Sequence, residues 1–129
     1  MQRDDLFGEN SGVINELAAA LKTYKGVVII ATEPVDSMTT LFVRTSGLPS
    51  TKVMGIGGCL DSARLRYLIG RELSMSTESI SAVVIGRHAS DMIPLPAYCR
   101  VSGIPVKSLM TAEKLAALID ELRKSGDLI

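Results

Sequence analysis

Residues 27–56 read VVIIATEPVDSMTTLFVRTSGLPSTKVMGI, and this stretch decides the fold. It opens with a short, uniformly apolar run, Val27–Ala31, which is typical of a buried strand in a parallel sheet. Pro34 suits the first turn of a helix, and Gly47 is suited to end that helix. A second apolar run, Val53–Ile56, predicts the next strand. The stretch is therefore expected to form one βαβ unit, with the right-handed crossover that parallel neighbours adopt.

Helices and short strands are predicted on both sides of this unit. Upstream, apolar residues recur at helical spacing within Val13–Leu21. Downstream, we expect a helix at 60–73, a strand at 81–86, an extended segment at 98–106 and a final helix that Thr111 opens. This alternation of helices and strands predicts an α/β fold.

Length, charge and cysteine usage exclude several classes of protein. With 129 residues, 47% of them apolar, the chain can bury one modest core. Its 14 basic and 14 acidic residues cancel, so neither nucleic acid nor a membrane surface is an expected partner. No apolar run approaches membrane-spanning length and no secretory leader is recognisable, which predicts a cytoplasmic protein. One histidine and two distant cysteines, Cys59 and Cys99, predict buried thiols and neither a metal site nor a disulfide.

Two polar segments after the βαβ unit carry the candidate chemistry. The first, Leu60–Arg66, reads LDSARLR and sets Asp61 and Arg64 three apart, on one face of the predicted helix. The second, Gly86–Pro96, reads GRHASDMIPLP and sets the only histidine, His88, at the end of an apolar strand. A carboxylate, a guanidinium and an imidazole are the groups needed to reduce a keto acid, because they can orient a ring, bind an anion and transfer a proton.

Five segments, taken in order, resemble the malate and lactate dehydrogenase family. Besides the two polar segments, they are Arg3–Asn10, Ala31–Asp36 and Val53–Gly58. The resemblance implies a partial Rossmann-type nucleotide-binding domain at residues 1–57 and the beginning of an α+β catalytic domain at 58–129. It also implies NAD as cofactor and a 2-hydroxy or 2-keto acid as substrate, with the motifs closer to the malate branch. The family's chain begins earlier, with a Gly-rich nucleotide loop, and continues further.

In that family, the residues matching His88, Asp61 and Arg64 carry the chemistry. His88 matches the acid/base that exchanges a proton with the substrate, and Asp61 matches the carboxylate that orients the imidazole. Arg64 matches the guanidinium that holds the substrate carboxylate through two hydrogen bonds. From the residues alone, a surface histidine, a helix-dipole aspartate and a solvated arginine remain open for these positions. Ala89 and Ser90 replace the family's Gly-Asp after the histidine, and a methyl group there restricts the turn.

Three positions in the first half of the chain match family residues that contact substrate or cofactor. Arg3 matches the arginine of a mobile lid, although an arginine so near the first residue is equally expected to be solvated. Asn10 matches a cofactor contact, and a polar helix residue without that role is the alternative. Glu33 replaces an asparagine that contacts substrate and nicotinamide, and its carboxylate would repel an anionic keto acid. A cap on the helix that begins at Pro34 is the other interpretation of Glu33.

The glycines of Gly55–Gly58 follow a strand and precede a helix, as in a dinucleotide loop, but Leu60 stands where the third glycine is needed. We therefore expect weak NAD binding, or none, by this chain alone.

Two classes of function remain. One is a malate dehydrogenase-like oxidoreductase whose nucleotide-binding half either comes from another polypeptide or is missing from this sequence. The other is a non-catalytic remnant or interaction module, and a homo-oligomer or association with a full-length relative is expected.

Overall fold

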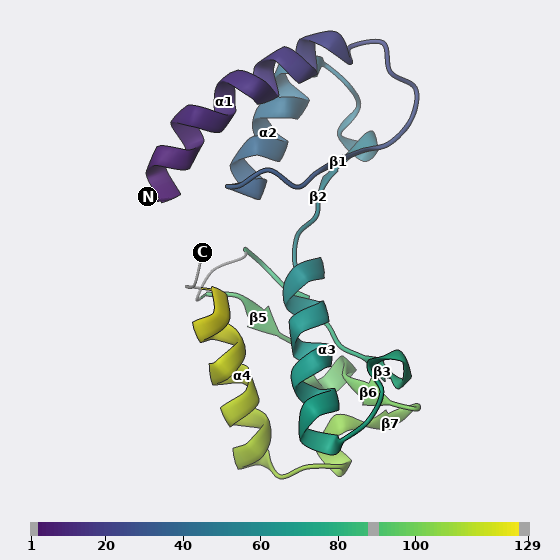
Figure 1. The fold of residues 1–129 in the computed structure, drawn as a ribbon. Helices are drawn as coiled ribbons and strands as arrows, with labels where there is room; N and C mark the ends of the chain where they lie inside the picture. Colours follow the sequence, from purple (N-terminus) through teal and green to yellow (C-terminus); the bar gives the residue numbers. More distant parts are fainter. Residues whose placement is uncertain (1–2, 88–90, 127–129) are drawn as a thin grey trace. The chain divides into compact units, whose positions relative to one another are not determined.

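The computed structural model describes residues 3–87 and 91–126, and the side chains of residues 6–87 and 91–125. Helices and short strands alternate along the sequence, as Figure 1 shows, so the expected α/β class is confirmed. The chain separates into two compact units, Met1–Ile56 and Gly57–Ile129. Each unit has its own cluster of buried apolar residues.

The first unit is a βαβ unit preceded by a long helix. Its elements are α1 (Arg3–Ala20), β1 (Val28–Ile30), α2 (Val35–Ser46), the 3-10 turn η1 (Ser50–Lys52) and β2 (Val53–Gly55). β1 and β2 run parallel, in a register that pairs Ile29 with Met54. α2 ends where Gly47 adopts a left-handed conformation, with φ 69°, and donates its N–H to the carbonyl of Val43 at 3.1 Å. The βαβ unit predicted from the sequence is therefore present.

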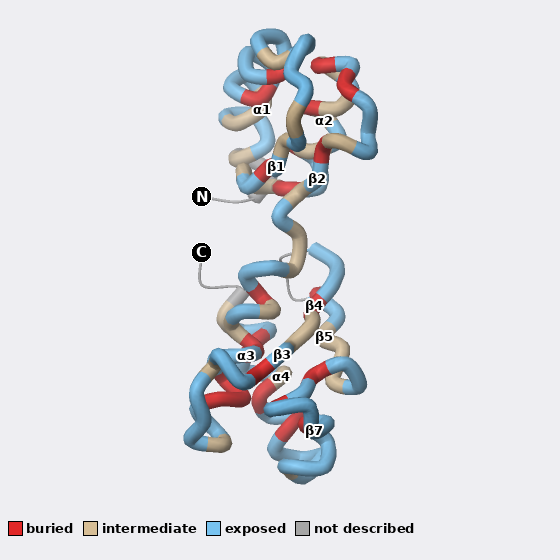
Figure 2. Tube along the Cα trace, turned by 90° about the vertical axis from the view of Figure 1, so that its right-hand side faces the viewer, coloured by how far each residue is buried: buried red, intermediate tan, exposed pale blue. Residues whose placement is uncertain are grey.

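One face of the β1–β2 pair is covered by α1 and α2. The buried cluster draws on the helices, the strands and the turn after α2: Ile14, Ala18, Ile30, Met38, Phe42, Leu48 and Val53. On the other face Ile29 is 64% exposed and its partner Met54 is also exposed. Figure 2 shows the same mixture of buried, intermediate and exposed residues around β1 and β2. The expected burial of the whole apolar run Val27–Ala31 is therefore wrong for Val27, Ile29 and Ala31, which are all exposed. Neighbours along a strand point to opposite faces, and within the described residues only one face is covered.

The second unit combines two helices with two small antiparallel sheets. Its elements are α3 (Cys59–Leu73), η2 (Thr77–Ser79), β3 (Ile80–Ser81), β4 (Val84–Ile85), β5 (Ile93–Pro94), η3 (Pro96–Tyr98), β6 (Arg100–Val101), β7 (Ile104–Pro105), η4 (Val106–Ser108) and α4 (Ala112–Gly126). β6 pairs with both β3 and β7, whereas β4 pairs with β5 as a hairpin. The buried side chains of α3 and α4, among them Leu65, Ile69, Leu118 and Leu122, form one cluster with those of the strands.

Two predicted extended segments differ from the observed strands. The single strand expected at 81–86 is replaced by β3 and β4, which pair with different partners. β4 begins at Val84, and the N–H of Val84 donates to the hydroxyl of Ser62 on α3 at 2.9 Å. This N–H is therefore not used to pair with another strand. The segment expected at 98–106 folds back between β6 and β7, where Gly103 adopts φ 84°.

The two cysteines differ in exposure, which corrects the expectation that both are buried. Cys59, the first residue of α3, is exposed, whereas Cys99 is fully buried. Burial raises the pKa of the Cys99 thiol, so less of the reactive thiolate forms near neutral pH. We expect a chromogenic disulfide reagent at pH 7.5 to titrate one thiol rapidly and the second only after denaturant is added. Rapid reaction of both thiols in the folded chain would contradict this assignment.

Two ion pairs join α3 to α4 beside the core. Arg71 donates hydrogen bonds from two guanidinium nitrogens to the two carboxylate oxygens of Glu121, at 2.8 and 2.6 Å. The ammonium of Lys114 lies 2.6 Å from a carboxylate oxygen of Glu72. The hydrogen bonds from Arg71 lower the pKa of Glu121 below its ordinary value. Glu121 is therefore ionised at neutral pH.

Glu121→Gln is expected to lower the thermal stability of the second unit at pH 7 but not at about pH 2. Because the pKa of Glu121 is lower in the folded chain, its stabilisation is present above the unfolded pKa of about 4.3 and is lost as the pH falls through the folded pKa. Thermal unfolding of the unmodified chain and of Glu121→Gln, followed by circular dichroism at the two pH values, measures the difference in melting temperature. An equal loss at both pH values would show that the effect is not electrostatic.

Candidate functional site

The start of α3 is fixed against β4, which sets the positions of Asp61 and Arg64. Gly58 precedes the helix, and a Cβ atom there would lie 2.0 Å from the carbonyl oxygen of Val84. Only glycine allows so close an approach. The hydroxyl of Ser62 accepts the N–H of Val84 at 2.9 Å. Both contacts hold the first turn of α3 beside the strand that precedes the histidine in sequence.

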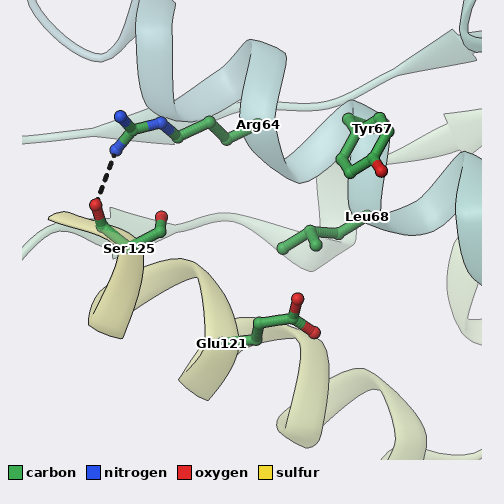
Figure 3. Close-up of a pocket in the computed structure, with 5 residues that line it drawn as sticks. All are labelled: Arg64, Tyr67, Leu68, Glu121 and Ser125. Atoms are coloured by element: carbon green, nitrogen blue, oxygen red, sulfur yellow. Dashed lines mark hydrogen bonds between the residues drawn. The ribbon is translucent and has the colours of Figure 1, made fainter. Parts of the chain in front are cut away.

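Asp61 and Arg64 lie together, as expected for residues three apart on a helix. Asp61 is fully buried in the first turn of α3, where the helix dipole favours a carboxylate. Nη1 of Arg64 lies 4.0 Å from Oδ1 of Asp61, which is an electrostatic contact rather than a hydrogen bond. The same nitrogen donates to the backbone carbonyl of Ser125 at 3.1 Å (Figure 3), and the side chain is 29% exposed. These contacts use one guanidinium nitrogen, so Arg64 retains N–H groups for an incoming carboxylate.

His88 lies outside the described residues, as do Ala89 and Ser90, so its role stays a prediction. The hairpin on either side of the three residues is described. Ile85 of β4 pairs with Ile93 of β5, and Gly86 adopts φ 89° as the chain leaves β4. Arg87 and Asp91 form an ion pair from the two sides of the turn. Both ends of the segment that carries His88 are therefore anchored in the second unit.

Asn10 and Glu33 lie together in the first unit. The side-chain amide of Asn10 donates to the backbone carbonyl of Glu33 at 2.7 Å. A carboxylate oxygen of Glu33 accepts the N–H of Val35, the first residue of α2, at 3.3 Å. An acceptor for a free N–H at the start of a helix is what a cap provides, so this contact favours the cap interpretation of Glu33. Arg3 begins α1, and its side chain lies outside the described part of the chain.

Four residues around Arg64 were not predicted from the sequence. Tyr67 and Leu68 of α3 and Glu121 and Ser125 of α4 line a pocket with it (Figure 3). Ser125 contacts Arg64 through its backbone carbonyl, which any residue could supply, so no sequence signal marks it. Glu121 carried a weak signal, since it is an acidic residue in the polar part of an amphipathic helix, but its partner Arg71 is fifty residues away.

The described part of the chain contains neither a metal-binding cluster nor a helix that could span a membrane. Within residues 3–87 and 91–126, no group of three or more His, Cys, Asp or Glu side chains could hold a metal ion. No helix in the same ranges combines the length and apolar character that crossing a bilayer requires. The carbonyl of Val84 occupies the space beside Gly58. This glycine therefore allows close packing against backbone and leaves no room there for the pyrophosphate of NAD.

Two family models together match almost the whole chain. The lactate/malate dehydrogenase NAD binding domain matches residues 1–55, and the lactate/malate dehydrogenase alpha/beta C-terminal domain matches residues 59–129. The chain belongs to the lactate/malate dehydrogenase family. The resemblance seen in the sequence motifs is thereby confirmed.

Relatives of this dehydrogenase-family chain match nearly all of it but extend well beyond it. The malate dehydrogenases of Heliobacterium modesticaldum and Synechocystis are 38% and 39% identical over 98% of this chain. The solved structure of Aeropyrum pernix malate dehydrogenase matches 98% of this chain with a TM-score of 0.87 and 36% identity. That of Cryptosporidium parvum lactate dehydrogenase matches 95% of it with a TM-score of 0.86 and 33% identity. The match covers only 41%, 40%, 42% and 41% of these four relatives, respectively. The chain thus spans about two fifths of their length.

Proposed function

We propose that this chain carries the substrate-binding and proton-transfer residues of a malate dehydrogenase-like oxidoreductase. Such an enzyme interconverts a 2-hydroxy acid, such as malate, and its 2-keto acid with NAD. The supporting observation is that Asp61 is fully buried one helical turn from Arg64, within a sequence that matches the family's motif. The proposal assigns the imidazole of His88 as a partner of that buried carboxylate.

Each of the three side chains has one task in this proposal. Arg64 binds the carboxylate of the substrate and so fixes the position of the neighbouring carbonyl. His88 gives a proton to the carbonyl oxygen during reduction and takes it back during oxidation. Asp61 orients the imidazole and stabilises its protonated form. NAD, when bound, supplies or accepts the hydride, and contacts to its pyrophosphate come from a segment other than Gly55–Gly58.

The assignments in the first unit follow the observed contacts. Asn10 and Glu33 stabilise the segment between β1 and α2, since their polar groups bond to that segment. We propose that they position this segment and that any contact with substrate or nicotinamide comes from its backbone. Arg3 is retained as the candidate lid residue, which would polarise the substrate carbonyl on closure.

A non-catalytic interaction module is the second candidate function. Leu60 and Tyr67 on α3 are exposed, and apolar side chains of this kind favour association with a second copy or a full-length relative. Under either function we place the protein in the cytoplasm. The two candidates differ in one measurable property: the module would confer no keto-acid reduction even when it replaces the matching segment of a full-length relative.

The contact between Asp61 and His88 can be tested on the chain itself. Asp61→Asn is expected to lower the pKa of His88 by about one unit, because a carboxylate stabilises the imidazolium and an amide of the same shape does not. His88 is the only histidine, so its imidazole signals in an NMR titration need no assignment. Asp120→Asn, which changes an exposed aspartate on α4, is the matched control and should leave the titration in place. An unchanged titration in Asp61→Asn would show that Asp61 does not contact His88.

A further inference from the structure

One edge of β4 carries backbone groups that the β4–β5 hairpin does not use. Beside β4, Leu95 donates its N–H to the carbonyl of Val83 at 2.9 Å. The next pair in the register joins Val84 to Pro94, which has no N–H to contribute. Hydrogen-bonded and non-bonded pairs alternate in an antiparallel ladder, so the N–H and C=O of Val84 point away from β5. Both polar groups of Val84 therefore need partners outside the hairpin.

A single hydroxyl on the first turn of α3 supplies these partners. Oγ of Ser62 accepts the N–H of Val84 at 2.9 Å and donates to the carbonyl of the same residue at 3.4 Å. Val84 is buried, so removing the hydroxyl would leave its N–H without a protein partner. Gly58 lets the two backbones approach, since a Cβ atom there would lie 2.0 Å from the carbonyl oxygen of Val84. The hydroxyl of Ser62 therefore fixes β4 on α3.

This contact joins the two segments that carry the proposed acid/base pair. Ser62 directly follows Asp61, whose side chain is fully buried. Val84 precedes His88 by four residues in the sequence. The attraction between a carboxylate and an imidazolium weakens as their separation grows. A shift of β4 along α3 would therefore change how strongly Asp61 stabilises the protonated ring in the proposed function.

We infer that Ser62 is a positioning residue whose hydroxyl sets the place of β4 on α3 and, through it, the contact between Asp61 and the imidazole of His88. The inference rests on the proposed function, which assigns that contact. Ser62 contacts neither substrate nor cofactor in this role and takes no part in proton transfer. Its effect is on the pKa of His88, because the carboxylate stabilises the imidazolium only at short range.

A matched pair of substitutions tests the hydroxyl in the isotope-labelled 129-residue chain. Ser62→Val and Ser62→Thr introduce side chains of the same shape, and only Ser62→Thr keeps the hydroxyl. In an NMR titration, Ser62→Val should lower the pKa of His88 by about half a unit, since a longer separation weakens the attraction of Asp61 without removing its charge. Ser62→Thr should keep the pKa of the unmodified chain. The amide hydrogen of Val84 should exchange faster in Ser62→Val than in Ser62→Thr.

Val101→Ala is the control for a general loss of packing. Val101 is buried on β6 and pairs with Ile80, so its truncation weakens the second unit without removing either hydrogen bond of Ser62. The pKa of His88 should stay as in the unmodified chain. If it falls as far in Val101→Ala or in Ser62→Thr as in Ser62→Val, the hydroxyl is not the cause and the inference is wrong.

The double variant Asp61→Asn/Ser62→Val separates this inference from the proposed function. If Ser62 acts through Asp61, the double variant should titrate as Asp61→Asn does alone, and a further fall in the pKa of His88 would contradict that route. If Asp61→Asn lowers the pKa but Ser62→Val does not, the proposed contact stands and only the positioning role is wrong. If Asp61→Asn leaves the pKa unchanged, both are overturned.

Discussion

Arg64→Gln is expected to reduce kcat/KM for keto-acid reduction about a thousandfold in a chimeric enzyme. The chimera is the Heliobacterium modesticaldum malate dehydrogenase in which this chain replaces the matching segment. Losing one partner of a charge-assisted, bidentate contact costs about 2–5 kcal/mol, and each 1.4 kcal/mol is about tenfold. Glutamine keeps a polar side chain but is shorter than arginine and carries no charge. NADH absorbance with oxaloacetate and with pyruvate measures the loss.

Two further substitutions on α3 show whether the loss is specific. Arg66→Gln removes an exposed arginine two residues away and should leave kcat/KM within about twofold, as exposed charges contribute little. Arg64→Lys keeps the charge but not the planar fork, so an intermediate loss is expected. Full activity in Arg64→Gln would remove Arg64 from the site. A chimera that shows no turnover before any substitution would favour the interaction module.

The ends of α2 and α3 were predictable because their signals are local, whereas α1 begins at Arg3, ten residues before the apolar periodicity that predicted it. The periodicity of apolar residues and the punctuation by Pro34 and Gly47 are sufficient to place α2, and the same holds for α3. The short strands of the second unit were not predictable in this way. β3 and β4 separate because Val84 bonds to Ser62 on α3, and that contact joins residues twenty-two apart in sequence. Strand pairing of this kind is determined by tertiary contacts, which no sequence window contains.

The candidate site was likewise predictable where it depends on local spacing and not where it depends on tertiary contacts. Asp61 and Arg64 were predictable as neighbours, since a separation of three residues on a helix brings side chains together whatever surrounds them. The burial of Asp61 and the bond from Arg64 to the carbonyl of Ser125 depend on how α4 and β4 pack against α3. Glu33 could be assigned to a cap or to the substrate from its sequence context, and only its contact with Val35 distinguishes them.

Phe42→Ala is expected to unfold the first unit and to leave the second unit folded. Phe42 is 1% exposed and lies in the cluster formed by α1, α2 and the β1–β2 pair. Replacing a buried phenylalanine by alanine costs about 3–5 kcal/mol, which combines lost burial with the cavity that remains. A unit of this size has a stability of only a few kcal/mol, so the loss exceeds its reserve. The second unit has its own cluster, which contains none of these residues.

Hydrogen exchange read by mass spectrometry separates the two units in a single experiment. In Phe42→Ala, peptides from α1, α2 and the two parallel strands should exchange as fast as in denaturant, while peptides around Leu65 and Leu122 keep their protection. The chain offers a matched control in Phe7, its only other phenylalanine, which is 44% exposed on α1. Phe7→Ala should change the stability of the first unit far less, because most of the lost surface already faces water. If protection disappears throughout the chain in Phe42→Ala, the two clusters fold as one cooperative structure, and the division into independently stable units is wrong.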